Sequence, residues 1–114
     1  MPDDCLFCRM AAGSVPVDKV HEDDRLIVIR DINPRAPTHV MLIPREHIPS
    51  VRDLGSQHTS LLAHMFSTAT RVAQGLGLAD RGYRLTFNVG DEGGQTIYHL
   101  HLHLLGGRRL GPEG

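Results

Sequence analysis

Residues 98–105 read YHLHLHLL, a stretch in which polar and apolar side chains alternate. Strict alternation is typical of a β-strand, because successive side chains point to opposite faces of a sheet. The stretch therefore predicts a strand over 98–105 with one histidine face and one apolar face. The histidine face consists of His99, His101 and His103, and the apolar face of Tyr98, Leu100, Leu102 and Leu104.

Further strands and two helices are predicted from the rest of the chain. Apolar residues recur at helical spacing between Leu61 and Leu76, and a short helix over 6–12 is expected to end at Gly13. Asp23 and Asp24 are turn formers between two β-branched runs, which predicts a hairpin. The four additional strands are expected at 17–22, 26–30, 38–43 and 83–89.

This order of elements predicts an α+β fold around a five-stranded, mainly antiparallel sheet with two helices. A doubly wound parallel sheet would need more crossover helices. The 114 residues contain no linker or repeat and fall within the usual size of one domain, so 1–114 is expected to form a single domain.

The charge and hydropathy of the chain exclude several classes of partner. A net charge of −1 gives no reason to expect binding to nucleic acid. The longest apolar runs, 26–29 and 40–43, are far shorter than the roughly 20 residues that span a bilayer. The first residues are acidic where a signal peptide is basic. We therefore expect a cytoplasmic protein with no membrane contact.

The three alternating histidines are expected to have different roles. Neighbouring members are about 6.6 Å apart on a strand and the outer pair about 13 Å apart. Zinc binds imidazole nitrogens at about 2.0–2.1 Å, so one ion cannot gather all three from a straight strand. A solvated face with unrelated histidines is the alternative. Because an imidazole is partly unprotonated near neutral pH, the row favours chemistry at phosphorus.

A glycine-rich turn precedes the histidines and offers hydrogen-bonding groups to an anion. Backbone amides at Gly94 can approach a phosphate closely, and Gln95, Thr96 and Asn88 are candidate donors. A tight hairpin and a strand-end cap are the simpler interpretations of these residues.

Cys5 and Cys8 form a pair separated by two residues. In a reducing compartment such a pair indicates a metal site or a redox pair, and two buried cysteines are the third interpretation. A tetrahedral zinc would need two more ligands from elsewhere in the fold.

The sequence resembles the histidine triad family, in its nucleotide-binding branch. The resemblance rests on the alternation at 99–105 and on two longer stretches. These are HEDDRLIVIRDINPRAPTHVMLIPREHI at 21–48 and GYRLTFNVGDEGGQTIYHLHLHLLGGR at 82–108. The resemblance implies a homodimer whose sheets join into one ten-stranded sheet. It also implies cleavage of purine nucleoside phosphoramidates, of AMP or GMP, through a nucleotidyl-histidine intermediate.

The resemblance also assigns roles to individual residues. It makes His101 the nucleophile and places His103 and His39 at the phosphate. Asp31 would hold the ribose hydroxyls. The residues expected at the phosphate or leaving group are Asn88, Gly94, Gln95 and Thr96, and those expected around the base are Ile32, Phe7, Met10 and Val15.

Zinc-bearing relatives complete a cysteine pair with two histidines, which here would be His47 and His99. The resemblance thus implies a structural Zn²⁺ on Cys5, Cys8, His47 and His99. The short tail RRLGPEG at 108–114 has no aromatic residue, so the leaving group is not predicted. Three more histidines, His21, His58 and His64, are expected on the surface.

Two other functions remain open from the sequence. One is hydrolysis of dinucleoside polyphosphates, which belongs to another branch of the family. The other is a regulatory protein that binds nucleotide and zinc with little turnover.

Overall fold

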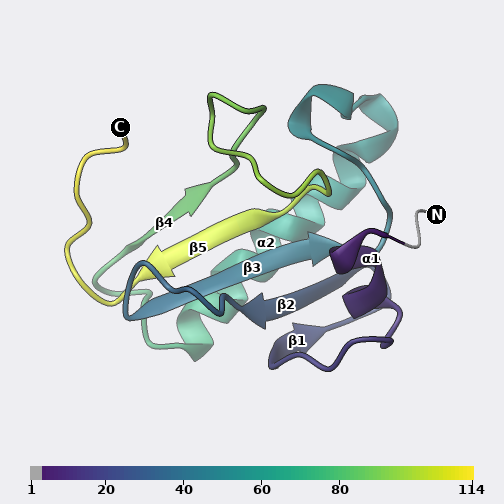
Figure 1. Ribbon diagram of the computed structural model, residues 1–114. Coiled ribbons are helices and arrows are strands. Elements are labelled where there is room, and N and C mark those ends of the chain that lie inside the picture. Colours follow the sequence, from purple (N-terminus) through teal and green to yellow (C-terminus); the bar gives the residue numbers. More distant parts are fainter. Residues whose placement is uncertain (1–3) are drawn as a thin grey trace.

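The computed structural model describes residues 4–114, and within them five strands form one antiparallel sheet beside two α-helices (Figure 1). The strand order is β1-β2-β3-β5-β4, and every pair of neighbours is antiparallel. This architecture confirms the predicted α+β fold. The elements are α1 (Leu6–Ala11), β1 (Lys19–Glu22), β2 (Leu26–Arg30), β3 (Thr38–Pro44), η1 (Val51–Asp53), η2 (Ser56–His58), α2 (Thr59–Gly75), β4 (Tyr83–Thr86) and β5 (Leu102–Gly106).

The two helices cover opposite faces of the sheet (Figure 1). Strand β2 is buried at four consecutive positions because both of its faces are covered. Leu26 and Val28 belong to the core beneath α2, whereas Ile27 and Ile29 pack with Phe7 of α1. The second face, which we call the α1 face, is where the candidate site lies.

Helix α2 packs through a stripe of apolar side chains, as its sequence period predicts. Its first turn is preceded by His58, whose Nδ1 accepts the backbone N–H of Gly55 at 3.0 Å. This histidine is only 7% exposed, so the expectation that it lies on the surface is wrong. The buried residues of the helix are Leu61, Met65, Thr68, Ala69, Val72 and Ala73.

The register of the central strands aligns polar side chains on the α1 face. His103 of β5 lies opposite Met41 of β3 on one side and Thr86 of β4 on the other. Residues opposite one another in an antiparallel pair point to the same face. Leu105 lies in the same way between His39 and Arg84. A row of side chains therefore crosses from β3 to the edge strand β4.

The predicted strand over 98–105 is shorter in the structure, because β5 begins only at Leu102. Its pairing with β3 stops at Leu102 opposite Leu42, and the backbone N–H of Leu100 donates instead to the carbonyl of Ile48 at 2.6 Å. Leu100 still reaches the core, but Tyr98 does not. The Tyr98 hydroxyl donates to Asp91 at 2.5 Å and the side chain is 39% exposed.

The other predicted boundaries differ by smaller amounts. Strand β4 ends at Thr86 instead of 89, because the segment that would extend the ladder, just before Leu102, has left the sheet. Strand β1 begins at Lys19 instead of 17, and α1 ends at Ala11, one residue early. Neither helix in residues 4–114 has the length and hydropathy that a membrane span requires.

Candidate active site

His99, His101 and His103 are buried next to one another, yet each contacts different groups. The ring centroids of His101 and His103 are 5.0 Å apart, and the Phe7 ring lies edge-on to His101 at the same separation. His99 instead lies 4.9 Å from the ring of His47. The structure thus separates the three side chains, as the spacing argument predicts.

His101 presents an unprotonated nitrogen. Its Nδ1 lies 2.7 Å from the backbone carbonyl of His99. A carbonyl oxygen can only accept, so Nδ1 carries the proton and Nε2 carries a lone pair. Burial also lowers the pKa of His101, which favours the neutral ring. A neutral imidazole with a free Nε2 is the form that can attack an electrophile.

His103 presents a hydrogen-bond donor, because a chain of contacts fixes its tautomer. The backbone N–H of Arg35 donates to Nδ1 of His39 at 3.2 Å, so the His39 proton is on Nε2. That Nε2–H donates to Nδ1 of His103 at 2.9 Å. The remaining proton of neutral His103 is then on its Nε2. One imidazole that can attack thus lies beside one that can donate.

Burial keeps the rings of His39 and His103 neutral. Burial, together with the neighbouring His101, His39 and Arg35, lowers the pKa of His103 to about 4. Burial likewise lowers the pKa of His39, although Asp31 opposes the change. The Asp31 carboxylate lies 3.4 Å from His39 Nε2. Asp31, His39 and His103 are close enough to hold a metal ion, but hydrogen bonding already accounts for their arrangement.

A pocket of about 860 Å³ opens beside these rings on the α1 face. Its apolar wall comes from α1 and β2, and its polar end contains both His101 and His103. Ile32 stands at the rim with 91% of its surface exposed. The predicted site residues that line the pocket are Phe7, Met10, Val15, Asp31, Ile32, Asn88, Gly94, Thr96, His101 and His103. His39 lies behind His103 instead.

Gln95 does not line the pocket, because its side chain is fully engaged elsewhere. Its Oε1 accepts from the Ser50 hydroxyl at 2.9 Å and from the Gly90 N–H at 3.0 Å. Its Nε2 donates to the carbonyls of Pro49 at 2.9 Å and Ile97 at 3.2 Å. In this structure the side chain of Gln95 therefore holds the glycine-rich turn against the loop after β3.

The glycine-rich turn is held close to the site by its backbone geometry. Asn88 donates from Nδ2 to the carbonyl of Gly93 at 2.8 Å. A Cβ at Gly93 would collide with the backbone of Val89, and Gly94 has a φ of +87°, which favours glycine. These contacts place Thr96 and Gly94 at the pocket wall.

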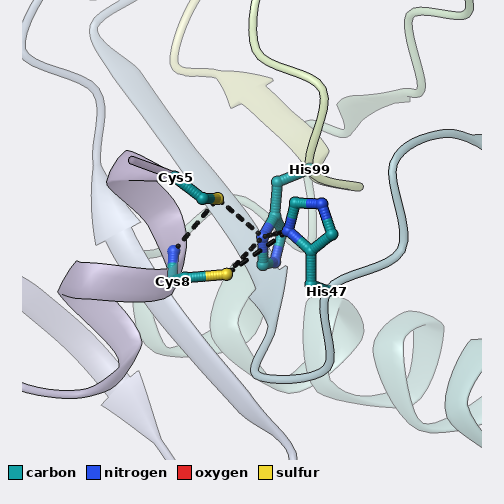
Figure 2. A group of neighbouring side chains, drawn as sticks. All are labelled: Cys5, Cys8, His47 and His99. Carbon is teal, nitrogen blue, oxygen red and sulfur yellow. Dashed lines mark hydrogen bonds between the residues drawn. The ribbon is translucent and has the colours of Figure 1, made fainter. Parts of the chain in front are cut away.

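A second group of side chains, Cys5, Cys8, His47 and His99, forms a candidate metal centre (Figure 2). Its four ligand atoms lie within 4.8 Å of one another. The nitrogens of the two histidines are 3.2 Å apart. Sulfur to nitrogen distances are 3.3 Å for Cys5 to His99, 3.3 Å for Cys8 to His47, and 3.5 Å for Cys8 to His99.

The tautomer of His99 also suits a metal. Its Nε2 lies 2.7 Å from the carbonyl of Pro44, so Nε2 carries the proton and Nδ1 points toward the cysteines as a lone pair. Cys5 additionally caps α1, since its sulfur accepts the N–H of Cys8 at 3.4 Å. The cluster can hold a metal ion, which would connect α1 to the loops after β3 and before β5.

Several groups that shape the site are not apparent from side-chain motifs. The N–H of Arg35 and the carbonyls of Pro44 and His99 each fix one tautomer through the backbone alone. Ser50 is buried and holds Gln95, but no pattern around it in the sequence indicates this.

The chain resembles known proteins along nearly its whole length. Residues 4–111 match the family model described as scavenger mRNA decapping enzyme C-term binding. A purine nucleoside phosphoramidase of Escherichia coli strain K12 is 43% identical over 112 residues, which cover 98% of this chain and 94% of that protein. An uncharacterized HIT-like protein of Synechococcus elongatus is 42% identical, with full coverage of both.

Solved structures give the same result. A HIT family hydrolase from Legionella pneumophila superposes with a TM-score of 0.96 at 47% identity, covering 97% of this chain and all of that one. A histidine triad protein from Clostridium difficile superposes with a TM-score of 0.95 at 36% identity, covering 98% and 97%. The chain therefore belongs to the histidine triad family and is a hydrolase.

Proposed function

We propose that this protein is a purine nucleoside phosphoramidase that cleaves the P–N bond of AMP or GMP amidates through a covalent intermediate on His101. The observation that carries the proposal is the pair of fixed tautomers, with the lone pair of His101 Nε2 beside the N–H donor of His103. The identity to the Escherichia coli phosphoramidase supports the choice of substrate.

The shape of the pocket suits a nucleoside. A volume of about 860 Å³ lies within the range of about 300–1,000 Å³ that is usual for small-molecule sites. The base would lie between Phe7, Met10 and Val15, with Ile32 covering its exposed side. The Asp31 carboxylate would accept hydrogen bonds from the ribose hydroxyls. This orientation brings the α-phosphate to the histidines.

The reaction proceeds in two displacements. In the first, the lone pair of His101 Nε2 forms a bond to the α-phosphorus as the P–N bond breaks, and the leaving nitrogen takes up a proton. In the second, water forms a P–O bond as the Nε2–P bond breaks, and the water releases a proton. The protons balance over the cycle, and one difficult displacement becomes two easier ones.

The surrounding groups stabilise charge on the phosphoryl oxygens. The N–H of His103 Nε2 is the nearest imidazole donor, and the Thr96 hydroxyl and the amides of the glycine-rich turn line the same wall. Donors that are fixed before the reaction begins give the largest stabilisation in such sites. The carbonyl of His99 holds His101 Nδ1–H and so stabilises the positive ring of the intermediate.

Hydrolysis of adenosine 5′-phosphoramidate tests the proposal. We expect turnover by the wild type and a loss of at least about 1,000-fold in kcat for His101→Ala, because the covalent route is removed. His64→Ala is the matched control, since His64 lies outside the pocket and contacts Asp23. Cleavage of diadenosine polyphosphates without cleavage of any phosphoramidate would assign the chain to the alternative reaction. Bound nucleotide without any cleavage would indicate a regulatory role.

We further propose that the cysteine and histidine cluster holds a structural Zn²⁺. With bonds of about 2.3 Å to sulfur and about 2.05 Å to nitrogen, a tetrahedral zinc has N···N and S···N edges of about 3.3 and 3.6 Å. The corresponding distances in the cluster, 3.2 Å for N···N and 3.3–3.5 Å for S···N, are close to these edges and slightly shorter. The ion would fix α1 and hence the apolar wall of the pocket.

Native mass spectrometry tests the zinc proposal. Protein purified without chelator is expected to carry one zinc per chain, and Cys8→Ser is expected to lose it and to melt at a lower temperature. Wild-type protein that carries no zinc and takes none up would contradict the proposal.

Finally, we propose a homodimer in which two copies of β4 join the sheets. Within residues 4–114, β4 pairs only with β5, so its other edge has no partner. Phe66 of α2 is 43% exposed and stacks edge-on against Phe87, which gives this edge an apolar surface. Light scattering is expected to give twice the 12.6 kDa mass of one chain, and Phe66→Asp is expected to shift it toward one.

A further inference from the structure

We propose that the enzyme prefers phosphoramidates whose leaving amine carries a carboxylate, and that Arg84 is the residue that selects it. This inference rests on the proposed function, because it concerns the leaving group of that reaction. Three features of the α1 face support it: a second hollow beside His103, its positive charge, and the position of the C-terminal tail.

The second hollow has a volume of about 250 Å³ and continues from the nucleotide pocket. It shares His103, Asn88 and Arg35 with that pocket. Its other walls come from β4 and β5 through Arg84, Thr86 and Leu105, with Glu113 of the tail.

The strand order places the two hollows on opposite sides of the reacting phosphorus. The nucleoside pocket contacts α1 and β2, the histidines lie on and beside β3 and β5, and the second hollow lies over β5 and β4. A substrate with its nucleoside over β2 and its phosphate at the histidines therefore directs its leaving group toward Arg84.

The second hollow is positively charged. Arg35 and Arg84 both line it, and Arg108 donates from Nη2 to the carbonyl of Arg35 at 3.0 Å. The charge of Arg35 reaches the histidines, since it contributes to the lowered pKa of His103 and of His39. Glu113 is the acidic residue of the lining. A leaving group with a carboxylate would meet mainly cations here.

In the structure, the C-terminal tail places a carboxylate next to Arg84, the same chemical group that we expect on the leaving amine. Arg84 donates from Nη2 to the carbonyl of Gly111 at 2.6 Å, and the same atom lies 3.4 Å from the Glu113 carboxylate. The Glu113 side chain is 86% exposed, so this ion pair is weak and a substrate carboxylate can replace it. Arginine suits the replacement because its planar guanidinium binds carboxylates through two parallel hydrogen bonds.

Two AMP phosphoramidates of nearly equal size provide the test. In one the leaving amine is glycine, and in the other it is glycinamide, so the pair differs in the carboxylate. Because the two amines also differ in basicity, the readout is the change in their kcat/KM ratio between enzyme variants. We expect Arg84→Gln to lower the ratio of glycine to glycinamide about tenfold, and Arg84→Lys to keep only part of it, because lysine retains the charge but not the two parallel hydrogen bonds.

The tail and a surface arginine supply further variants. Glu113→Gln is expected to raise kcat/KM for the glycine substrate severalfold, because a competing carboxylate is removed. Arg81→Gln is the matched control, since Arg81 is exposed and lies outside both hollows. It is expected to leave the ratio unchanged.

Unsubstituted adenosine 5′-phosphoramidate separates a failure of the proposed function from a failure of the proposed role of Arg84. Failure to hydrolyse it together with both substituted phosphoramidates overturns the proposed function. Hydrolysis of it combined with an unchanged ratio in Arg84→Gln overturns the role of Arg84 alone. An equal loss of kcat/KM for the glycine and the glycinamide substrate also overturns that role, because Arg84 would then act only on the structure of the site.

Discussion

At the scale of single residues, the chemistry of the site depends on which ring nitrogen carries the proton. A backbone carbonyl fixes the tautomer of His99 and another that of His101, and a backbone N–H fixes His39 and through it His103. These tautomers suit the four histidines to the different roles proposed for them: metal ligand for His99, nucleophile for His101, relay for His39 and donor for His103. The sequence identifies the histidines by type and spacing. It does not show which backbone group each ring nitrogen meets, because that depends on the local backbone path and the side-chain rotamer, even where the partner is only two or four residues away, as for His101 and His39.

The buried state of His103 predicts how stability depends on pH. Its pKa is about 4 in the folded chain and about 6.5 when unfolded, so the unfolded chain binds the additional proton between these values. The stability that neutral His103 contributes is complete above about pH 6.5 and is lost as the pH falls toward 4. The slope is at most about 1.4 kcal/mol per pH unit for one proton.

Urea unfolding of wild type and His103→Gln between pH 7 and 4 measures this effect. The wild type is expected to lose stability more steeply, because glutamine does not titrate. Parallel pH profiles would show that His103 is not the buried group responsible.

The contact between Ser50 and Gln95 is expected to stabilise the folded chain and to support activity. Gln95→Ala leaves the N–H of Gly90 and the carbonyl of Pro49 without their partner, so we expect a loss of about 1–3 kcal/mol of stability and a lower kcat/KM. Ser50→Ala should share part of this loss. Urea unfolding of both variants and the double variant measures the coupling, and strictly additive losses would contradict this contribution of the contact.

At the scale of elements, the sequence predicts the periodic segments well and their ends poorly. The period of α2 and the apolar runs of β2 and β3 are strong signals because both faces of the sheet are buried. The alternation of buried sides begins before β5, since Leu100 already points into the core. Alternation reports which side is buried, whereas a strand also needs a partner, and the pairing of β5 with β3 stops at Leu102 opposite Leu42.

Asp23 connects the β1–β2 hairpin to α2, so we expect its side chain to contribute to the free energy of unfolding. Its Oδ1 accepts the N–H groups of Arg25 at 2.8 Å and Leu26 at 2.9 Å. Its Oδ2 lies 2.9 Å from His21 and 2.8 Å from His64. Although burial opposes it, these hydrogen bonds hold the pKa of Asp23 below its usual range.

Asp23→Ala is therefore expected to lower the free energy of unfolding by about 1–3 kcal/mol at neutral pH. Because the folded pKa is lowered, the contribution is present above about pH 4 and declines as the pH falls below it. The neighbouring exposed Asp24→Ala is the control in urea unfolding. Equal effects of the two substitutions would contradict this role of Asp23.

At the scale of the whole molecule, one face of the sheet carries the groups of the proposed reaction. The pocket proposed for the nucleoside, the histidines and the arginine-lined hollow follow one another from β2 to the edge strand β4. The cysteine and histidine cluster supports the α1 side of this face, where Phe7 contacts both His99 and His101. The family resemblance predicts half of the residues that line the larger pocket. The second hollow becomes apparent only when β4 and the tail are placed.

The central claim is that His101 forms a covalent bond to the nucleotide. Rapid acid-free quenching of wild-type enzyme during turnover of adenosine 5′-phosphoramidate, followed by peptide mass spectrometry, tests it directly. We expect an adenylyl group on the peptide containing His101, at Nε2 of that ring, and none in His101→Ala. An adenylyl group on His103 instead, or undiminished turnover by His101→Ala, would contradict it.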